Sequence, residues 1–166
     1  AMAAPTDEER DRPALWRYWR RLPPHGHVGI FFGAWEKSLI VHRAFDKISD
    51  AEFEQGLERL VEFEQMLSQE NVLIVKFWLH LSKRAQKRRL QALEADPLEC
   101  WRVDKHVWKL HRNYDEVRRV AEQMVRRTNN VGAMWHIIEG ENYRYRNLTV
   151  AQRLLDALQT RLHVAA

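Results

Sequence analysis

The stretch Asn71–Arg89, with the sequence NVLIVKFWLHLSKRAQKRR, constrains the fold more than any other part of this chain. Between Val72 and Leu79 every residue except Lys76 is apolar, and the β-branched and aromatic side chains favour a strand that is buried on both faces. Ser82 then stands where a helix N-cap belongs, and good helix formers follow it. The stretch therefore predicts a buried parallel strand that leads into a basic helix, a junction at which open α/β sheets bind ligands.

Hydrophobic periodicity divides the rest of the chain into alternating helices and strands. The predicted strands are 27–35, 72–79 and 133–139. The predicted helices are 7–21, 50–69, 83–95, 104–127 and a last helix from Asn147 or Thr149 to Leu162. Pro13 requires the first helix either to begin near Arg12 or to kink, and segment 36–47 has no clear pattern. The alternation predicts an α/β fold, a parallel sheet with helices on its faces, in one domain of 166 residues.

Composition limits which partners and which cellular location are expected. The net charge of +4 permits an anionic ligand. Tryptophan and arginine alternate over 16–21, as in some nucleic-acid-binding segments, but on a helix the tryptophans share one face and are expected to pack in the core. No nucleic acid is therefore predicted as a partner. Cys100 is the only cysteine, which excludes a disulfide within the chain and favours a reducing, cytoplasmic location. No apolar run approaches the roughly 20 residues of a membrane span, and the polar N-terminus does not read as a signal peptide.

The predicted helix 83–95 carries the strongest candidate for chemistry. Its cations are Lys83, Arg84, Lys87, Arg88 and Arg89. Arg84 and Arg88 share one helix face and Lys83 and Lys87 share the adjacent one, so the group either binds phosphate oxygens or forms a solvated surface. His80 closes the preceding strand and either faces a site or is structural, and none of the eight histidines lies in a zinc-binding motif.

Several long stretches resemble the family-2 polyphosphate kinases, and within them the two-domain polyphosphate:AMP phosphotransferases. The matching stretches are 5–26, VGIFFGAW (28–35), 63–90, DPLECWRV (96–103), RRTNNVGAMWHIIEG (126–140) and YRYRNLTV (143–150). The resemblance implies a P-loop-kinase-like fold of three layers, with a parallel sheet, flanking helices and a helical lid over about 83–127. Family members begin with a strand, a Walker A loop and a second strand. Against that pattern, the chain is expected to be a truncated, partial domain that spans residues 1–166.

The resemblance also assigns site residues. Phe32 and Gly33 stand where active family members carry an Asp-Arg pair, and only Trp35 persists from that motif. The chain is therefore expected to resemble the non-catalytic N-terminal copy, with no catalytic residue and no metal ligand. The lid positions that match the family's polyphosphate-facing helix are Lys83, Arg84, Arg88 and Arg89, followed in the lid by Arg102 and Lys105.

Three functions remain open on these grounds. The first is a non-catalytic part of an enzyme that transfers a phosphoryl group from polyphosphate to AMP, giving ADP with Mg²⁺. In that case the domain is structural or contacts polyphosphate, and it associates with a catalytic copy or with itself. The second is a stand-alone polyanion-binding or oligomerisation module. The third is an independently active kinase.

Overall fold

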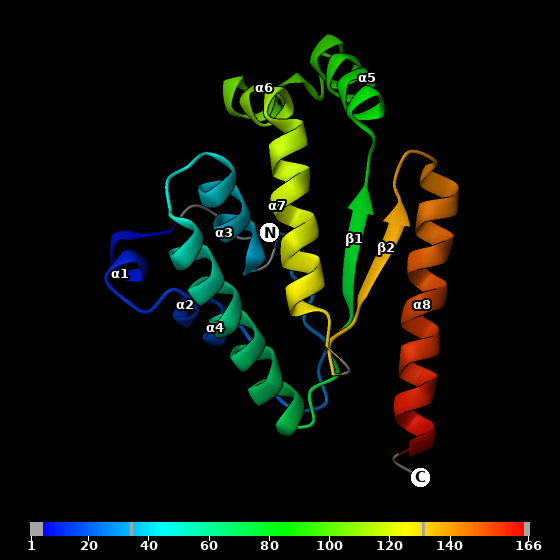
Figure 1. Ribbon diagram of the computed structural model, residues 1–166. Helices are drawn as coiled ribbons and strands as arrows, with labels where there is room; N and C mark the ends of the chain where they lie inside the picture. The colour runs from blue at the N-terminus through cyan, green and yellow to red at the C-terminus, as the bar shows by residue number, and fades with distance from the viewer. Residues whose placement is uncertain (1–4, 34, 131, 165–166) are drawn as a thin grey trace. The chain divides into compact units, whose positions relative to one another are not determined.

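The computed structural model describes residues 5–33, 35–130 and 132–164, which form two compact units, 1–56 and 57–166. The first unit holds α1 (Asp7–Arg10), α2 (Trp16–Trp19), α3 (Glu36–Ala44) and the start of α4 (Asp50–Gln69). The second holds the rest of α4, β1 (Lys76–His80), α5 (Lys83–Ala95), the 3₁₀ helix η1 (Cys100–Arg102), α6 (Lys105–Arg112), α7 (Tyr114–Thr128), β2 (Trp135–Glu139) and α8 (Tyr143–Val164) (Figure 1). The single domain over 1–166 and the lid over 83–127 stay predictions.

The predicted helix 7–21 is in fact two short helices. Thr6 and Glu9 form a capping box at α1, since each side chain bonds to the other residue's backbone N–H, at 3.2 and 3.1 Å. Pro13 lies between the two helices, where no helical hydrogen bond requires its missing N–H. Helical spacing predicts an apolar stripe of Leu15, Trp16, Trp19 and Leu22. That prediction is wrong for Trp19, which is 49% exposed, whereas Tyr18, outside the stripe, is buried.

The predicted strand 27–35 is wrong for the residues that the structure describes. Residues 27–33 and 35 form no strand, and Ala34 lies outside the described residues. Val28, Ile30 and Phe32 alternate as in a strand, but they are 79%, 90% and 77% exposed. Alternation alone does not make a strand, because backbone N–H and C=O groups need a neighbouring strand to form a ladder. The described residues provide no such neighbour for this segment.

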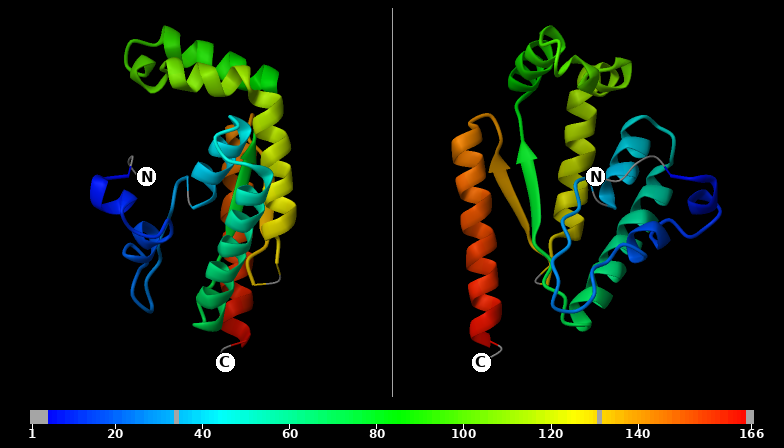
Figure 2. Two further views of the ribbon diagram at one scale, coloured as in Figure 1. Left: turned by 60° about the vertical axis from the view of Figure 1, so that its left-hand side comes forward. Right: turned by 180° about the vertical axis from the view of Figure 1, so that it is seen from behind.

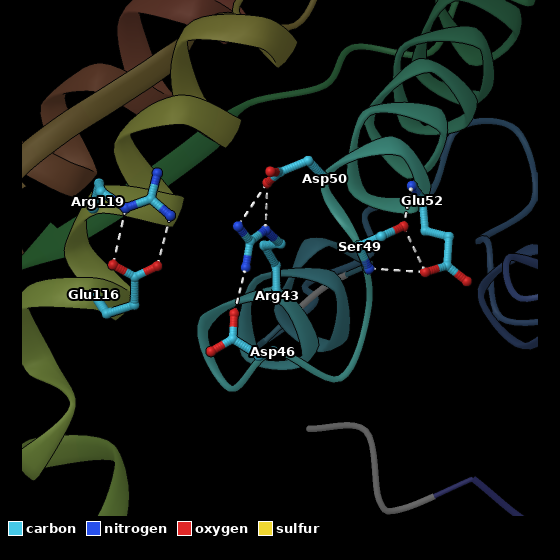
Figure 3. A network of polar contacts seen from close by, with 7 residues as sticks. All are labelled: Arg43, Asp46, Ser49, Asp50, Glu52, Glu116 and Arg119. Carbon is cyan, nitrogen blue, oxygen red and sulfur yellow. Dashed lines mark hydrogen bonds and ion pairs between the residues drawn. The ribbon is translucent and has the colours of Figure 1, made fainter.

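The bounds of α4 match the prediction because the capping box of Ser49 and Glu52 is present (Figure 3). Ser49 N and Oγ each donate to Glu52 Oε2 at 2.8 Å, and Glu52 N donates to Ser49 Oγ at 3.2 Å. These bonds favour the charged carboxylate and lower the pKa of Glu52. Arg43 donates to both Asp46 and Asp50 at 2.8 Å, which fastens the turn between α3 and α4. Helical spacing predicts a core face of five residues: Phe53, Leu57, Leu60, Val61 and Leu67. Val61 is only half-buried, and the other four are buried.

β1 and β2 pair in parallel, from Lys76 opposite Trp135 to His80 opposite Glu139, as the alternation of helices and strands predicts. Figure 1 and the view from behind in Figure 2 show α8 running beside β2. The prediction that the first of these strands is buried on both faces is wrong. It begins at Lys76 rather than Val72, and Leu79 is 45% exposed. Of the five residues in β1, only Lys76 is buried.

Lys76, the polar exception in the apolar run, is an anchor of the core. Its Nζ lies 2.6 Å from Glu64 Oε2 on α4 and 2.8 Å from the Thr128 carbonyl oxygen at the end of α7. The ammonium also lies 4.9 Å from the ring centroid of Trp135 on β2, and Trp135 Nε1 donates to Thr128 Oγ1 at 2.8 Å. The Lys76 and Glu64 side chains are only 5% and 0% exposed. One buried charge pair thus connects two helices and both strands.

Two predicted helix bounds are corrected. The helix predicted over 104–127 divides at Asn113 into α6 and α7, although Asp104 caps α6 as expected by accepting from Val107 N at 2.8 Å. The last helix begins at Tyr143, because Asn142 Oδ1 accepts from the N–H groups of the second and third residues of α8. No helix among the described residues combines the length and the apolar composition needed to cross a bilayer.

Candidate anion-binding site

The carboxyl ends of β1 and β2 lie at one edge of the sheet, and the candidate site is built there. α5 begins at this edge after β1, and α8 begins there after β2 (Figure 1). Gly140 N donates to the His80 carbonyl oxygen at 2.7 Å, and Tyr114 Oη donates to the Leu81 carbonyl oxygen at 2.7 Å. A Cβ at Gly140 would lie 2.9 Å from the His80 oxygen, so this close approach requires glycine. The start of α5 is therefore held in place by both neighbouring segments.

Ser82 caps α5 as the sequence predicts. Its side chain accepts a hydrogen bond from Ala85 N at 3.2 Å, and α5 runs from Lys83 to Ala95 with the predicted bounds. This cap fixes the residue at which α5 begins. The start of the helix in turn sets which way the side chains of its lysines and arginines point.

We expect Ser82→Ala to lower the free energy of unfolding by about 1 kcal/mol, the usual effect of losing an N-cap. Urea unfolding followed by circular dichroism measures it. Ser38→Ala is the matched control, because Ser38 is exposed within α3, where alanine is at least as good a helix former. Equal effects of the two substitutions would show that the cap at α5 does not matter.

Four cations share one face of α5. At about 100° per residue, Lys83, Lys87, Arg84 and Arg88 span roughly 140° of the helix circumference. All four are exposed, whereas Ala85 and Leu90, which lie outside this arc beyond its two ends, are buried. We call these four residues the basic face. Arg89, the remaining predicted site residue of this helix, is also exposed but lies about 100° beyond Arg88, outside the basic face.

Carboxylates from distant segments bind the two outer members of the basic face. Lys83 Nζ lies 2.5 Å from Asp115 Oδ2 on α7, and Arg88 pairs with Glu141 in the β2–α8 loop. The hydrogen bond from Lys83 lowers the pKa of Asp115, and the positive charge of Lys83 adds to the effect. The two inner members, Arg84 and Lys87, make no ion pair with any described residue. Sequence reasoning missed both carboxylates because they lie 32 and 53 residues from their partners.

His111 of α6 packs against α5 at Gln86, which lies outside the basic face. It is 8% exposed, its Nδ1 lies 2.7 Å from Gln86 Oε1, and the Trp108 ring lies edge-on at 5.6 Å. Burial lowers the pKa of His111, and the charges of Lys83 and Lys87 lower it further. Both effects disfavour the protonated imidazole in the folded chain.

A pH effect follows from this burial. The unfolded chain protonates His111 near its ordinary pKa of about 6.5, whereas the folded chain does so only at lower pH. Stability is therefore full above about pH 6.5 and falls as the pH drops through that value towards the folded pKa. We expect His111→Gln to flatten this part of the profile, measured by urea unfolding between pH 7.5 and 5. An unchanged profile would show that another group titrates.

The remaining predicted positions lie as follows. Arg102 pairs with Glu99 in its own 3₁₀ turn, Lys105 opens α6, and His80 is partly buried at the end of β1. Phe32 and Gly33 belong to the first unit, where Phe32 is 77% exposed and Gly33 has φ +67. Within the described ranges, no three His, Cys, Asp or Glu side chains gather closely enough to hold a metal ion.

Comparison with known proteins identifies relatives for the whole chain. The pattern of the polyphosphate kinase 2 (PPK2) family matches residues 1–165. The chain is 44% identical over 158 residues to a polyphosphate:AMP phosphotransferase of Pseudomonas aeruginosa, which is 95% of this chain and 32% of that protein. It is 29% identical to an AMP/ADP-polyphosphate phosphotransferase of Meiothermus ruber, over 96% of this chain and 60% of that protein.

A solved structure agrees with this result. Polyphosphate kinase 2 from Arthrobacter aurescens TC1 superposes with a TM-score of 0.91 at 31% identity, over 96% of this chain and 56% of that one. The fold is thus of the α/β type that the resemblance implied, with a parallel pair of strands flanked by helices. The chain spans about a third of the length of the Pseudomonas relative. The chain belongs to the polyphosphate kinase 2 family.

Proposed function

We propose that this chain is a non-catalytic domain of a polyphosphate:AMP phosphotransferase and that the basic face of α5 contacts polyphosphate. The observation that carries the proposal is the exposure of four cations on one helix face, at the carboxyl edge of a parallel sheet. Guanidinium and ammonium groups bind phosphate oxygens by charge-assisted hydrogen bonds, and a polymer of phosphates can engage several cations at once. The name of the Pseudomonas relative supports polyphosphate as the anion and AMP as the acceptor in the whole protein.

The side chains at positions 32 and 33 support a non-catalytic role. Mg²⁺ binds oxygen ligands, and phosphoryl transfer depends on positioned cations that neutralise charge on the transferred group. Phe32 carries a benzyl group and Gly33 no side chain, so neither supplies a metal ligand or a cation. Mg²⁺ does not fit the side chains of these two positions, and the complete enzyme would bind it through other residues.

The activity test is direct. We expect the 166-residue chain, incubated with labelled polyphosphate, AMP and Mg²⁺, to form no ADP above the rate without protein. Clear turnover that depends on Mg²⁺ would contradict the non-catalytic role and favour an independently active kinase.

Binding tests the polyphosphate contact separately. We expect Arg84→Ala with Arg88→Ala to weaken polyphosphate binding about tenfold, because exposed charge pairs contribute up to about 1 kcal/mol each. The matched control is Arg59→Ala with Arg153→Ala, which removes the same charge from two exposed positions on α4 and α8. Isothermal titration at fixed salt measures both. Equal losses in the two variants would show that net charge alone attracts the polymer.

One observation favours the second candidate function, an oligomerisation module. Leu148, Leu155 and Leu162 recur every seven residues along α8 and are 71%, 48% and 69% exposed. Such a heptad spacing favours helix–helix association. We propose that a second copy covers this face if the chain assembles alone, and sedimentation at micromolar concentration tests it. A monomer would contradict self-association.

A further inference from the structure

We propose that Asp115 and Glu141 are built-in competitors for the basic face: each carboxylate holds one of its outer cations and thereby sets how tightly the face binds a polyanion. The inference rests on the proposed polyphosphate contact and adds to it the residues that tune affinity. Neither carboxylate belongs to the predicted set of site residues, and neither lies on α5.

The arrangement of the pairs is the first support. The inner cations, Arg84 and Lys87, lie between the two outer ones on the helix circumference. Asp115 on α7 binds the outer member on one side, and Glu141 in the β2–α8 loop binds the outer member on the other. The face therefore presents two accessible cations flanked by two that are already occupied.

The second support is the large sequence separation between the two residues of each pair. Neighbouring ion pairs on α7 are local: Arg119 binds Glu116 three residues away, and Arg118 binds Glu122 four residues away. Such pairs follow from helical spacing alone. The two pairs on the basic face instead join segments 32 and 53 residues apart. Folding brings each carboxylate to a cation that could otherwise bind phosphate.

Solvent exposure makes the pairs exchangeable. The side chains of Lys83 and Asp115 are 47% and 71% exposed, and those of Arg88 and Glu141 are both 53% exposed. Exposed pairs contribute only about 0.2–1 kcal/mol, so a multivalent anion can displace the carboxylates at a modest cost. Neutralising one carboxylate removes that cost and one repulsive charge, which corresponds to a gain in affinity of about 1.4- to fivefold per pair.

The test compares the 166-residue chain with Asp115→Asn plus Glu141→Gln in titrations with tripolyphosphate and with long-chain polyphosphate. We expect the double variant to bind both more tightly, by about two- to thirtyfold, the product of the gains from the two pairs. Each cation freed to bind phosphate should also steepen the plot of log affinity against log salt by roughly 0.7, by analogy with single-stranded nucleic acids. The control is Glu8→Gln plus Glu122→Gln, which removes the same charge and frees Arg12 and Arg118 from exposed pairs elsewhere.

The outcomes separate this inference from the proposed function. A gain in the double variant alone, with a steeper salt slope, supports competition. An equal gain in the control would overturn it in favour of net charge. If the double variant binds like the wild type while Arg84→Ala with Arg88→Ala weakens binding, the polyphosphate contact stands and the competition fails. If no variant binds either polymer, both proposals fail. Matching unfolding midpoints exclude misfolding as the cause.

Discussion

Glu64→Gln is expected to lower the free energy of unfolding by about 3–5 kcal/mol, because it leaves the ammonium of Lys76 buried without its counter-charge. Lys76 is 6% exposed and cannot reach solvent without opening the junction of α4, α7 and the two strands. Its remaining partners, the Thr128 carbonyl oxygen and the Trp135 ring, carry no full negative charge. Urea unfolding followed by circular dichroism measures the loss.

Two further variants make this result interpretable. Glu62→Gln changes an exposed residue of the same helix and should alter stability by less than about 0.5 kcal/mol. Glu64→Leu with Lys76→Met removes both charges and should recover most of the stability, since apolar replacement of a buried pair is often neutral. If the double variant is as unstable as Glu64→Gln, packing at this site matters more than the unpaired charge.

Phe53→Ala is expected to lower the free energy of unfolding by about 3–5 kcal/mol, through lost burial and the cavity left behind. Phe53 is 1% exposed on the inner face of α4. The chain offers an unusually close control in Phe32→Ala, the same chemical change at a residue of the same unit that is 77% exposed. Phe32→Ala should change stability by less than about 0.5 kcal/mol.

The Phe32 control also bears on function. A large loss of stability in Phe32→Ala would show that this side chain is covered, which would contradict its exposure in the structure. A small loss would show that a phenylalanine at this position is not needed for packing.

Local chemistry explains which elements the sequence predicts. α4 and α5 begin at their predicted residues because Ser49 and Ser82 supply caps that bond to nearby N–H groups. The sequence predicts the start of α8 too late. Asn142 caps this helix, and the tyrosines and arginines that follow show no clear apolar period. The strand predicted over 27–35 fails since a strand depends on a distant partner, which no local pattern reveals.

The candidate site divides in the same way. The cations of α5 follow from helical spacing, so the sequence identifies them and even shows which share a face. Asp115 and Glu141 reach that face only through the tertiary fold, and neither has a sequence neighbour that signals its role. Lys76 stands out in the sequence as the polar exception in an apolar run, but its partner Glu64 is one of several acidic residues on α4, and nothing local marks it as the partner.

The position of the buried Lys76–Glu64 pair has a consequence for recognition at the other end of the strand. Strand register is set by which side chains must be buried, and a slip of one residue turns every side chain to the opposite face. Lys76 occupies the first paired position of β1, so its need for Glu64 fixes the register of the whole ladder. Six residues later Ser82 starts α5. A charge pair in the core thus helps to set the direction in which the cations of α5 point.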